Sequence, residues 1–144
     1  MSKQTENIEQ RMAFEVSGEI YAVDVLAVKE VLRFSMITPI PRSLSFVLGL
    51  INLRGNVVTI IDGRKRLNVA EGEITDETRI IIIDGQEHPI GIVVDSVREV
   101  IDIDREKIEP SSSNNQEEQS FIQGIYHLHD ELHILIDHAT LLSE

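Results

Sequence analysis

One stretch near the middle of the chain, residues 49–62, constrains the fold more than any other. It reads Gly-Leu-Ile-Asn-Leu-Arg-Gly-Asn-Val-Val-Thr-Ile-Ile-Asp, so two apolar runs flank Arg54-Gly55-Asn56. A glycine beside an asparagine supplies the positive φ of a tight connection, and the stretch therefore predicts a β-hairpin. Its unusual feature is Arg54, a full charge at the tip of two strands that otherwise belong in a core. Arg54 is either a solvated turn residue or a charge held in place to pair with a carboxylate or a partner protein.

Before this hairpin, the sequence alternates between apolar and polar residues. Alternation over residues 12–16, a turn at Gly18-Glu19 and a return over residues 20–23 predict a first hairpin. Asp24 is suited to cap a short helix over residues 25–32, where apolar residues recur at helical spacing. Because β-branched residues are common in that segment, a third strand is the competing interpretation.

The second half of the chain resembles the first in character. Residues 79–84 carry four consecutive isoleucines, which suit a strand buried on both faces. Residues 89–95 form the returning strand, with a bulge at Gly91, and residues 97–103 form another strand. The last hairpin is predicted over residues 121–128 and 132–136, around His129-Asp130-Glu131.

The remaining segments are expected to connect these strands. We predict an extended connector at residues 38–41, a helical turn at 43–48, a surface helix at the basic run 64–66 and a terminal helical turn after Asp137. Residues 1–9 and 111–120 are polar and are expected to be flexible.

About ten short strands with short helices between them are typical of closed β-barrels, so the protein is predicted to be mainly β. Two small barrels side by side fit 144 residues better than one. With the acidic loop at residues 70–77 as the seam, we expect a single domain, 1–144, with a first barrel over about 10–75 and a second over about 76–144. An exchange of terminal strands between the barrels remains open.

Composition excludes several classes of function. Thirteen Lys and Arg against 25 Asp and Glu give a net charge of −12, which repels nucleic acids and anionic membranes. The absence of cysteine excludes disulfides and thiol chemistry. The polar N-terminus lacks the apolar core of a signal peptide, and residues 43–53 are too short to span a bilayer. A cytoplasmic protein without direct membrane insertion is expected.

The sequence presents no convincing reaction site. No Gly-x-Ser-x-Gly motif occurs, and the eight glycines are scattered singly, so no catalytic residue and no cofactor are predicted. The alternative is a ligand or metal site in the histidine-rich C-terminal hairpin, although turn and edge histidines are the simpler explanation. The histidines concerned are His127, His129, His133 and His138. A compact β protein of this kind is interpreted as a binding module, with apolar residues of segment 25–32 and the charges of Glu30 and Arg54 as its candidate surface.

Several stretches resemble the CheW-type chemotaxis coupling proteins. The main match is Gly49-Leu-Ile-Asn-Leu-Arg-Gly55 followed by Val57-Val-Thr-Ile-Ile-Asp62. Supporting matches, in the same order as in the family, are Tyr21-Ala-Val-Asp24 with Val28-Lys-Glu-Val31, Gly91-Ile-Val-Val-Asp95 with Val97, and Ile108-Glu-Pro110 ahead of Phe121-Ile-Gln-Gly124. The resemblance covers roughly residues 12–142. It departs from the family at Thr59, where proline is usual, and at Gly63, where leucine is usual.

The resemblance implies two side-by-side five-stranded SH3-like β-barrels with short connecting helices. It also implies a non-enzymatic adaptor that joins the cytoplasmic tip of methyl-accepting chemoreceptors to the histidine kinase CheA. By motif position, the kinase-facing residues are Val28, Val31 and Gly49. The receptor-facing residues are Val25, Glu30, Leu53, Arg54, Ile92, Val94 and Val97. Since Glu30 and Arg54 are charges in otherwise apolar motifs, we expect them to form an ion pair.

Overall fold

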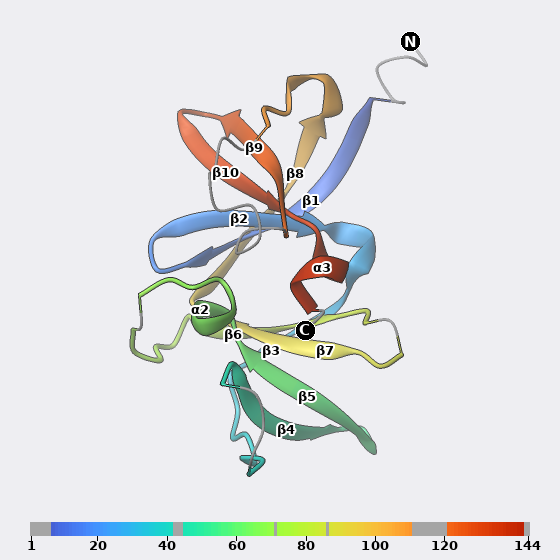
Figure 1. Ribbon diagram of the computed structural model, residues 1–144, viewed down its shortest axis with the longest axis vertical. Helices are drawn as coiled ribbons and strands as arrows, with labels where there is room; N and C mark the ends of the chain where they lie inside the picture. Colours follow the sequence, from blue (N-terminus) through green and yellow to red (C-terminus); the bar gives the residue numbers. More distant parts are fainter. Residues whose placement is uncertain (1–6, 42–44, 71, 86, 111–120, 143–144) are drawn as a thin grey trace.

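The computed structural model describes residues 7–41, 45–70, 72–85, 87–110 and 121–142, and these residues form two five-stranded sheets (Figure 1). The first sheet has the order β8-β1-β2-β10-β9, and the second has the order β3-β6-β7-β5-β4. The strands are β1 (Ile8–Val16), β2 (Glu19–Asp24), β3 (Val28–Arg33), β4 (Val47–Leu53), β5 (Asn56–Asp62), β6 (Arg79–Ile83), β7 (Ile90–Val94), β8 (Ser96–Asp104), β9 (Ile122–Leu128) and β10 (Glu131–Ile136). The helices are the short 3₁₀ turns η1 (Val25–Ala27) and η2 (Arg105–Lys107) and the α-helices α2 (Gly63–Arg66) and α3 (His138–Leu142).

Each sheet curls until its two edges meet. Thr38, beyond the end of β3, pairs with Leu50 of β4, and Glu109, beyond the end of β8, pairs with Ile125 of β9. We call the two closed units the β1-barrel (β1, β2, β8, β9 and β10) and the β3-barrel (β3 to β7). Closure pairs the edge strands that would otherwise be open to aggregation. The predicted mainly β fold of two five-stranded barrels is confirmed.

The barrels do not follow the expected division into residues 10–75 and 76–144. Strands β1 and β2 lie beside β8, β9 and β10, and β6 and β7 lie beside β3, β4 and β5. Each barrel therefore combines three consecutive strands of one half with the hairpin of the other half, which is the strand exchange that the sequence left open. The period-2 pattern identifies strands but not their neighbours, so it does not reveal this exchange.

An internal repeat underlies the two barrels. Exchanging each strand with the one five places away in the chain converts one sheet order into the other, and each barrel has one parallel pair, β2 with β10 and β5 with β7. Residues 46–67 and 121–142 align at a constant spacing of 75 positions. Identical residues in this alignment are Phe46 and Phe121, Gly49 and Gly124, Leu53 and Leu128, Ile61 and Ile136, Asp62 and Asp137, and Leu67 and Leu142.

Equivalent residues of the two halves also form equivalent hydrogen bonds. The amide N of Asp62 donates to Phe46 O over 2.7 Å, and that of Asp137 donates to Phe121 O over the same distance. Each aspartate also caps the helix that follows it. The cap predicted at Asp137 is therefore confirmed, and the two halves share this cap at equivalent positions.

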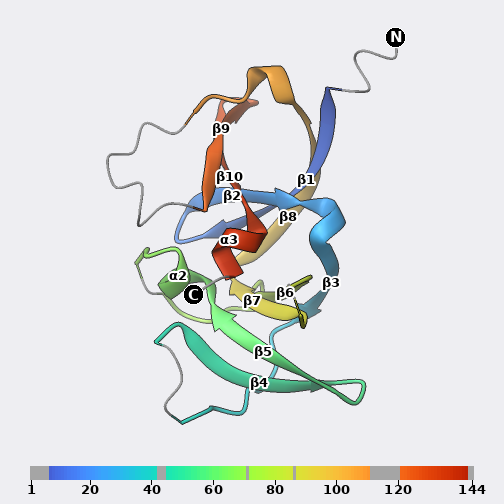
Figure 2. The same ribbon diagram turned by 45° about the vertical axis from the view of Figure 1, so that its right-hand side comes forward.

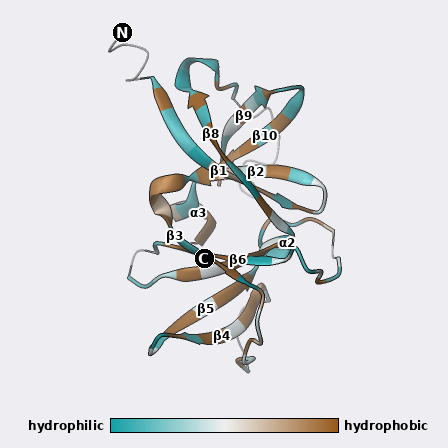
Figure 3. Cartoon of the chain, turned by 180° about the vertical axis from the view of Figure 1, so that it is seen from behind, coloured by the Kyte–Doolittle hydropathy of each residue, from teal (hydrophilic) through white to brown (hydrophobic). Residues whose placement is uncertain are grey.

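The largest hydrophobic cluster lies between the barrels and is built from both of them. Strand β6 explains how one strand serves two cores: its four isoleucines are all buried, with Ile81 and Ile83 in the shared cluster and Ile80 and Ile82 in the β3-barrel cluster. Figure 3 shows hydrophobic colour along the strands of this barrel. Burial on both faces is what the run of isoleucines predicted.

Three boundaries differ from the sequence predictions. Only residues 25–27 are helical, and residues 28–33 form strand β3, because its β-branched residues pair with β6. Residues 47 and 48 belong to β4 rather than to a helical turn. Ile8 and Glu9, which were expected to be flexible, extend β1 and pair with β8, whereas residues 1–6 lie outside the described part of the chain. Residues 111–120 lie outside the described residues.

Two local features differ from the sequence predictions. Gly91 is not a bulge, because its pairing with β5 and β6 is uninterrupted; a Cβ there would lie 2.5 Å from Ile60 Cδ1, so close packing requires the glycine. The last hairpin turns at His129 and Asp130, whose φ values are 52° and 64°, and Glu131, expected in the turn, begins β10. His133 consequently lies opposite Tyr126.

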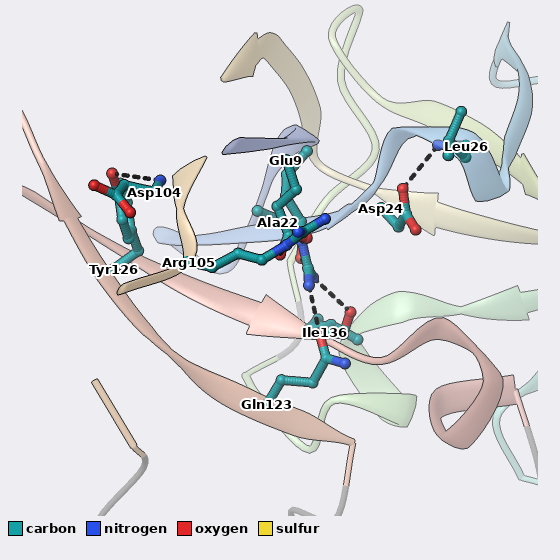
Figure 4. Close-up of polar contacts among 10 residues, drawn as sticks. Glu9, Ala22, Asp24, Leu26, Asp104, Arg105, Gln123, Tyr126 and Ile136 are labelled. Carbon is teal, nitrogen blue, oxygen red and sulfur yellow. Dashed lines mark hydrogen bonds and ion pairs between the residues drawn. The ribbon is translucent and has the colours of Figure 1, made fainter. Parts of the chain in front are cut away.

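The polar groups of two buried side chains of the β1-barrel, Arg11 and Tyr126, are hydrogen-bonded. Arg11 is 6% exposed and donates to Ile136 O (3.0 Å) and Gln123 Oε1 (2.7 Å). Tyr126 Oη accepts a bond from the amide of Asp104 (3.1 Å; Figure 4). These bonds satisfy groups that burial would otherwise leave without a partner.

Candidate functional site

The tip of the β4–β5 hairpin has the geometry that its sequence predicts. Arg54 and Gly55 adopt positive φ values of 53° and 88°, which produce a two-residue turn. The side chain of Asn52 accepts a hydrogen bond from the amide of Gly55 (2.9 Å). This bond stabilises the turn without using the Arg54 side chain, which extends beyond the strand ends.

Arg54 pairs with Glu30 of β3, as expected from the sequence. Its Nη2 contacts Glu30 Oε2, and its Nη1 lies 3.5 Å from Oε1. The hydrogen bond and the charge of Glu30 raise the pKa of Arg54. The side chain of Arg54 is 69% exposed and that of Glu30 is 30% exposed, so the pair lies at the surface. The pair connects strand β3, not a helix, to the hairpin tip.

The residues around the pair differ in exposure. Val31 is 36% exposed, whereas Val28 is partly buried against the shared cluster. Val25 is partly buried in η1, and the neighbouring Leu26 is 86% exposed. Asp24 caps this turn through the amide of Leu26 (3.0 Å; Figure 4). Leu26, which the sequence reasoning did not single out, is thus held at the surface.

The other predicted site residues are mainly internal. Ile92 and Val94 are buried in the shared cluster, and Val97 packs against it. Leu53 packs against the β3-barrel cluster. Gly49 is buried where the barrel closes, and a Cβ there would lie 2.0 Å from Thr38 O. Gly49 therefore shapes the barrel beneath the surface.

The C-terminal histidines are dispersed. His133 is 1% exposed, and both of its ring nitrogens lack a hydrogen-bond partner. His127 lies 3.3 Å from Glu109 at the surface, and His129 forms the turn. A hollow between β5, the β6–β7 connection and α3 is lined by His138, but by neither His127 nor His129. Among the described residues, no group of three or more candidate ligands is placed to hold a metal ion, so the alternative of a metal or ligand site in this hairpin lacks support.

The basic run after β5 is helical, as predicted, but it is not simply a solvated face. Arg64 pairs with Asp95, and Arg66 donates to Leu141 O (2.6 Å). Burial lowers the pKa of Arg66. Gly63, a departure from the usual family pattern, is required here because a Cβ would lie 2.4 Å from Val93 O. Thr59, the other departure, is paired in β5 with Leu50 and Ile90.

Within the described residues, no helix has the length and apolar character needed to cross a membrane. Two closed barrels share one hydrophobic cluster and display an ion-paired hairpin tip, and Val31, next to Glu30 in β3, is 36% exposed. This combination defines a β-barrel protein-interaction module.

Comparisons with known proteins identify the family. The sequence model of the CheW-like domain matches residues 10–144. The chemotaxis protein CheW of Bacillus subtilis (strain 168) is 36% identical over 145 residues, covering 100% of this chain and 93% of that protein. The chemotaxis protein CheW of Helicobacter pylori is 29% identical over 145 residues, covering 99% and 88%. The crystal structure of the scaffolding protein TtCheW from Thermoanaerobacter tengcongensis superposes with a TM-score of 0.86 at 33% identity, covering 94% of this chain and 93% of that one. The chain belongs to the CheW-like domain family.

Proposed function

We propose that this protein is a non-enzymatic chemotaxis adaptor that joins the cytoplasmic tip of chemoreceptors to the histidine kinase CheA. The observation that carries the proposal is the match to the CheW-like domain over residues 10–144, together with the ion-paired tip within the family's central motif. Relatives named as chemotaxis and scaffolding proteins support it. The adaptor acts in the cytoplasm and reaches the membrane arrays through its partners.

The kinase-facing surface in this proposal is centred on Val31. Its side chain is exposed on β3 and offers an apolar contact to a partner. Val28 and Gly49 support this surface from below, because Val28 packs on the shared cluster and Gly49 lets the closing segment approach β4. Kinase specificity then resides in the exposed side of β3.

The receptor-facing surface is centred on the Glu30–Arg54 pair. Leu53 is the last residue of β4, next to Arg54, and Val25 lies in η1, directly before β3. Val97 is partly exposed, whereas Ile92 and Val94 act through packing because their side chains are buried. An adaptor that holds both partners raises their effective concentration toward each other, so a change in the receptor reaches the kinase without a chemical step.

The test measures binary binding of the full chain to a chemoreceptor signalling-tip fragment and to the kinase regulatory domain by calorimetry. We expect binding to both. Arg54→Glu should weaken receptor binding, and the swap Glu30→Arg/Arg54→Glu should recover part of the loss if the pair acts as a unit. The control is the charge swap Arg98→Glu/Glu131→Arg on the β1-barrel, where the native Nη2–Oε1 distance is 2.9 Å. Because Arg98 also pairs with Glu15 (3.2 Å), the folding of this control is checked by thermal melting. Failure of the wild-type chain to bind either partner would refute the proposal.

A further inference from the structure

The internal repeat creates two equivalent frames between the barrels. We use the word frame for a helix together with the strand connection beside it. The first frame is α2 with the β1–β2 turn at Ser17 and Gly18, and the second is α3 with the connection between β6 and β7. Figure 2 shows α2 and α3 at different positions between the barrels. Because the repeat gives each residue of one frame an equivalent residue in the other, the residues that differ between the frames can be compared directly.

The chain covers the first frame with its own backbone. Ser17 Oγ of the β1–β2 turn donates to Ala70 O, and Arg64 of α2 donates to Gly72 O (2.6 Å) and Glu73 O (3.1 Å). Arg64 also pairs with Asp95. The hydrogen bonds from the frame to this segment end on backbone carbonyl oxygens, so the frame holds a non-helical peptide segment largely independently of its side chains.

The second frame contains a hollow of about 780 Å³, which we call the α3 groove. Its volume lies within the range of about 300–1,000 Å³ that is usual for ligand sites. The apolar part of its lining is Val57, Pro89, Ile90, Ala139 and Leu142. The polar part includes Asp84, Glu87, His88 and His138.

Two sequence differences distinguish the second frame from the first, and one of them, Ala139, lines the hollow. At the spacing of 75 positions, Ala139 stands where α2 has Arg64. Ile61 pairs with Ile92 in one barrel and Ile136 pairs with Val23 in the other, so Asp95 corresponds to Leu26, three residues beyond Val23. The positions of the Arg64–Asp95 ion pair are thus occupied in the second frame by alanine and by Leu26, which is 86% exposed.

We propose that the α3 groove binds an extended peptide segment of a partner protein, in the manner in which the α2 frame holds residues 70, 72 and 73. The apolar lining suits an apolar side chain near the middle of the segment. Asp84 is already paired with Lys29 (3.4 Å), so the carboxylate of Glu87, in a protein of net charge −12, is the group that favours basic residues beside it. His88 and His138 also line the groove, and an imidazole N–H is a donor suited to carbonyl oxygens of the segment.

This site is separate from the Glu30–Arg54 pair, and the inference does not depend on the adaptor proposal. Neither Glu30 nor Arg54 lines the groove. Binding there is predicted for the chain alone, without a receptor or a kinase.

The experiment selects peptides from a display library of short random sequences on the full chain and counter-selects on Leu26→Asp/Ala139→Arg. This double variant introduces the residues of the Arg64–Asp95 pair at the equivalent positions, and it places a guanidinium group at position 139, which lines the groove. Selected peptides are synthesised with blocked ends, and their binding is measured by fluorescence anisotropy and mapped by NMR chemical shifts. A second variant, Val57→Arg, acts at a side chain that is 61% exposed, and Leu132→Arg at the equivalent, 44% exposed position of the other half is its control.

We expect selected peptides to carry an apolar centre with flanking Lys or Arg, and to shift the resonances of Ile90 and Ala139. Both the double variant and Val57→Arg should weaken binding at least tenfold, whereas Leu132→Arg should leave it unchanged. Selection of helical or acidic peptides, peptides that bind the double variant equally well, or no enrichment over the double variant would overturn the proposal.

Discussion

Phe46 and Phe121 lie against the same guanidinium group. The Cζ atom of Arg66 is 5.4 Å from the ring centre of Phe46 and 5.3 Å from that of Phe121. The two phenylalanines occupy equivalent positions of the internal repeat, before β4 and β9. Arg66 also donates to the carbonyl oxygens of Leu141 and Thr140 at the end of α3. The Arg66 side chain therefore links the two halves of the repeat.

Replacing Arg66 should lower stability more than replacing a surface arginine. Arg66→Leu, which copies the residue at the equivalent position 141, loses both cation–π contacts and both carbonyl bonds, and we expect the free energy of unfolding to fall by about 2–4 kcal/mol. Arg66→Lys keeps the charge but not the planar fork, so it should recover only part of this loss. Urea unfolding measures both, with the exposed Lys65→Leu as control. Equal stability of Arg66→Leu and the control would contradict this role.

The closing glycines should be intolerant of alanine. A Cβ at Gly49 would lie 2.0 Å from Thr38 O, and one at Gly124 would lie 2.7 Å from Glu109 O. Each substitution pushes the closing segment away from the barrel, at a cost of about 1–3 kcal/mol. Gly18→Asn is the control, because nothing lies within 4 Å of a Cβ there and asparagine tolerates positive φ. Thermal melting that ranks the control as the least stable variant would refute the steric explanation.

The buried imidazole of His133 should be replaceable with a gain in stability. Both ring nitrogens are buried without a partner, and the equivalent position in the β3-barrel is Val58, which is 1% exposed. His133→Val removes two unsatisfied polar atoms, each of the kind that costs about 1–3 kcal/mol, while leaving a small cavity. We expect the urea midpoint of His133→Val to rise and that of the exposed His127→Val to stay constant. A lower midpoint for His133→Val would mean that its nitrogens are satisfied in solution.

Local pattern was enough to predict most elements and the ion-paired tip. Period-2 alternation identified several strands, the run of isoleucines identified β6, the Gly-Asn turn identified the central hairpin, and the isolated charges of Glu30 and Arg54 identified their pairing. Segment 28–33 was first expected to be helical, and only the competing interpretation made it a strand. The pairing partners of the strands were not predictable in this way, because alternation carries no information about which strand lies alongside. Hence the exchange of hairpins between barrels was not resolved.

The repeat at a spacing of 75 positions was the signal that the sequence reasoning did not use. Alignment of residues 46–67 with 121–142 places His133 on Val58, which marks it as a core residue rather than an edge histidine. The same alignment sets Phe46 beside Phe121 as equivalent residues. The contact of Arg66 with both rings still requires the structure, because it depends on how the halves pack.

Two valines of β3 distinguish a binding surface from a core. Val31→Asp acts at a side chain that is 36% exposed, so we expect the melting temperature to stay close to that of the wild type while kinase binding weakens at least tenfold. Val28 packs on the shared cluster, so Val28→Asp buries a charge and should lower the melting temperature markedly. Differential scanning fluorimetry and calorimetric titration separate the two effects. If Val31→Asp unfolds the chain, Val31 belongs to the core.

Tyr21 should make the fold sensitive to alkali. Its ring is 4% exposed and stacks on Phe14 at 5.8 Å; burial, with a smaller contribution from the charge of Glu19, raises the pKa of Tyr21 to about 12. Below pH 10 the phenol is neutral in the folded and unfolded chains, so its stabilising contribution is fully present. Between pH 10 and about 12 the unfolded chain loses this proton first, and the free energy of unfolding falls.

Tyr21→Phe removes the ionisation while keeping the ring, so its stability should fall less steeply than that of the wild type over the same pH range. Urea unfolding of both proteins at several pH values from about 9 to about 12 measures the difference. Because other groups titrate equally in the two proteins, the difference isolates Tyr21. Parallel stability curves would show that the phenol ionises in the folded state as readily as in the unfolded chain, and that its burial does not oppose the charge.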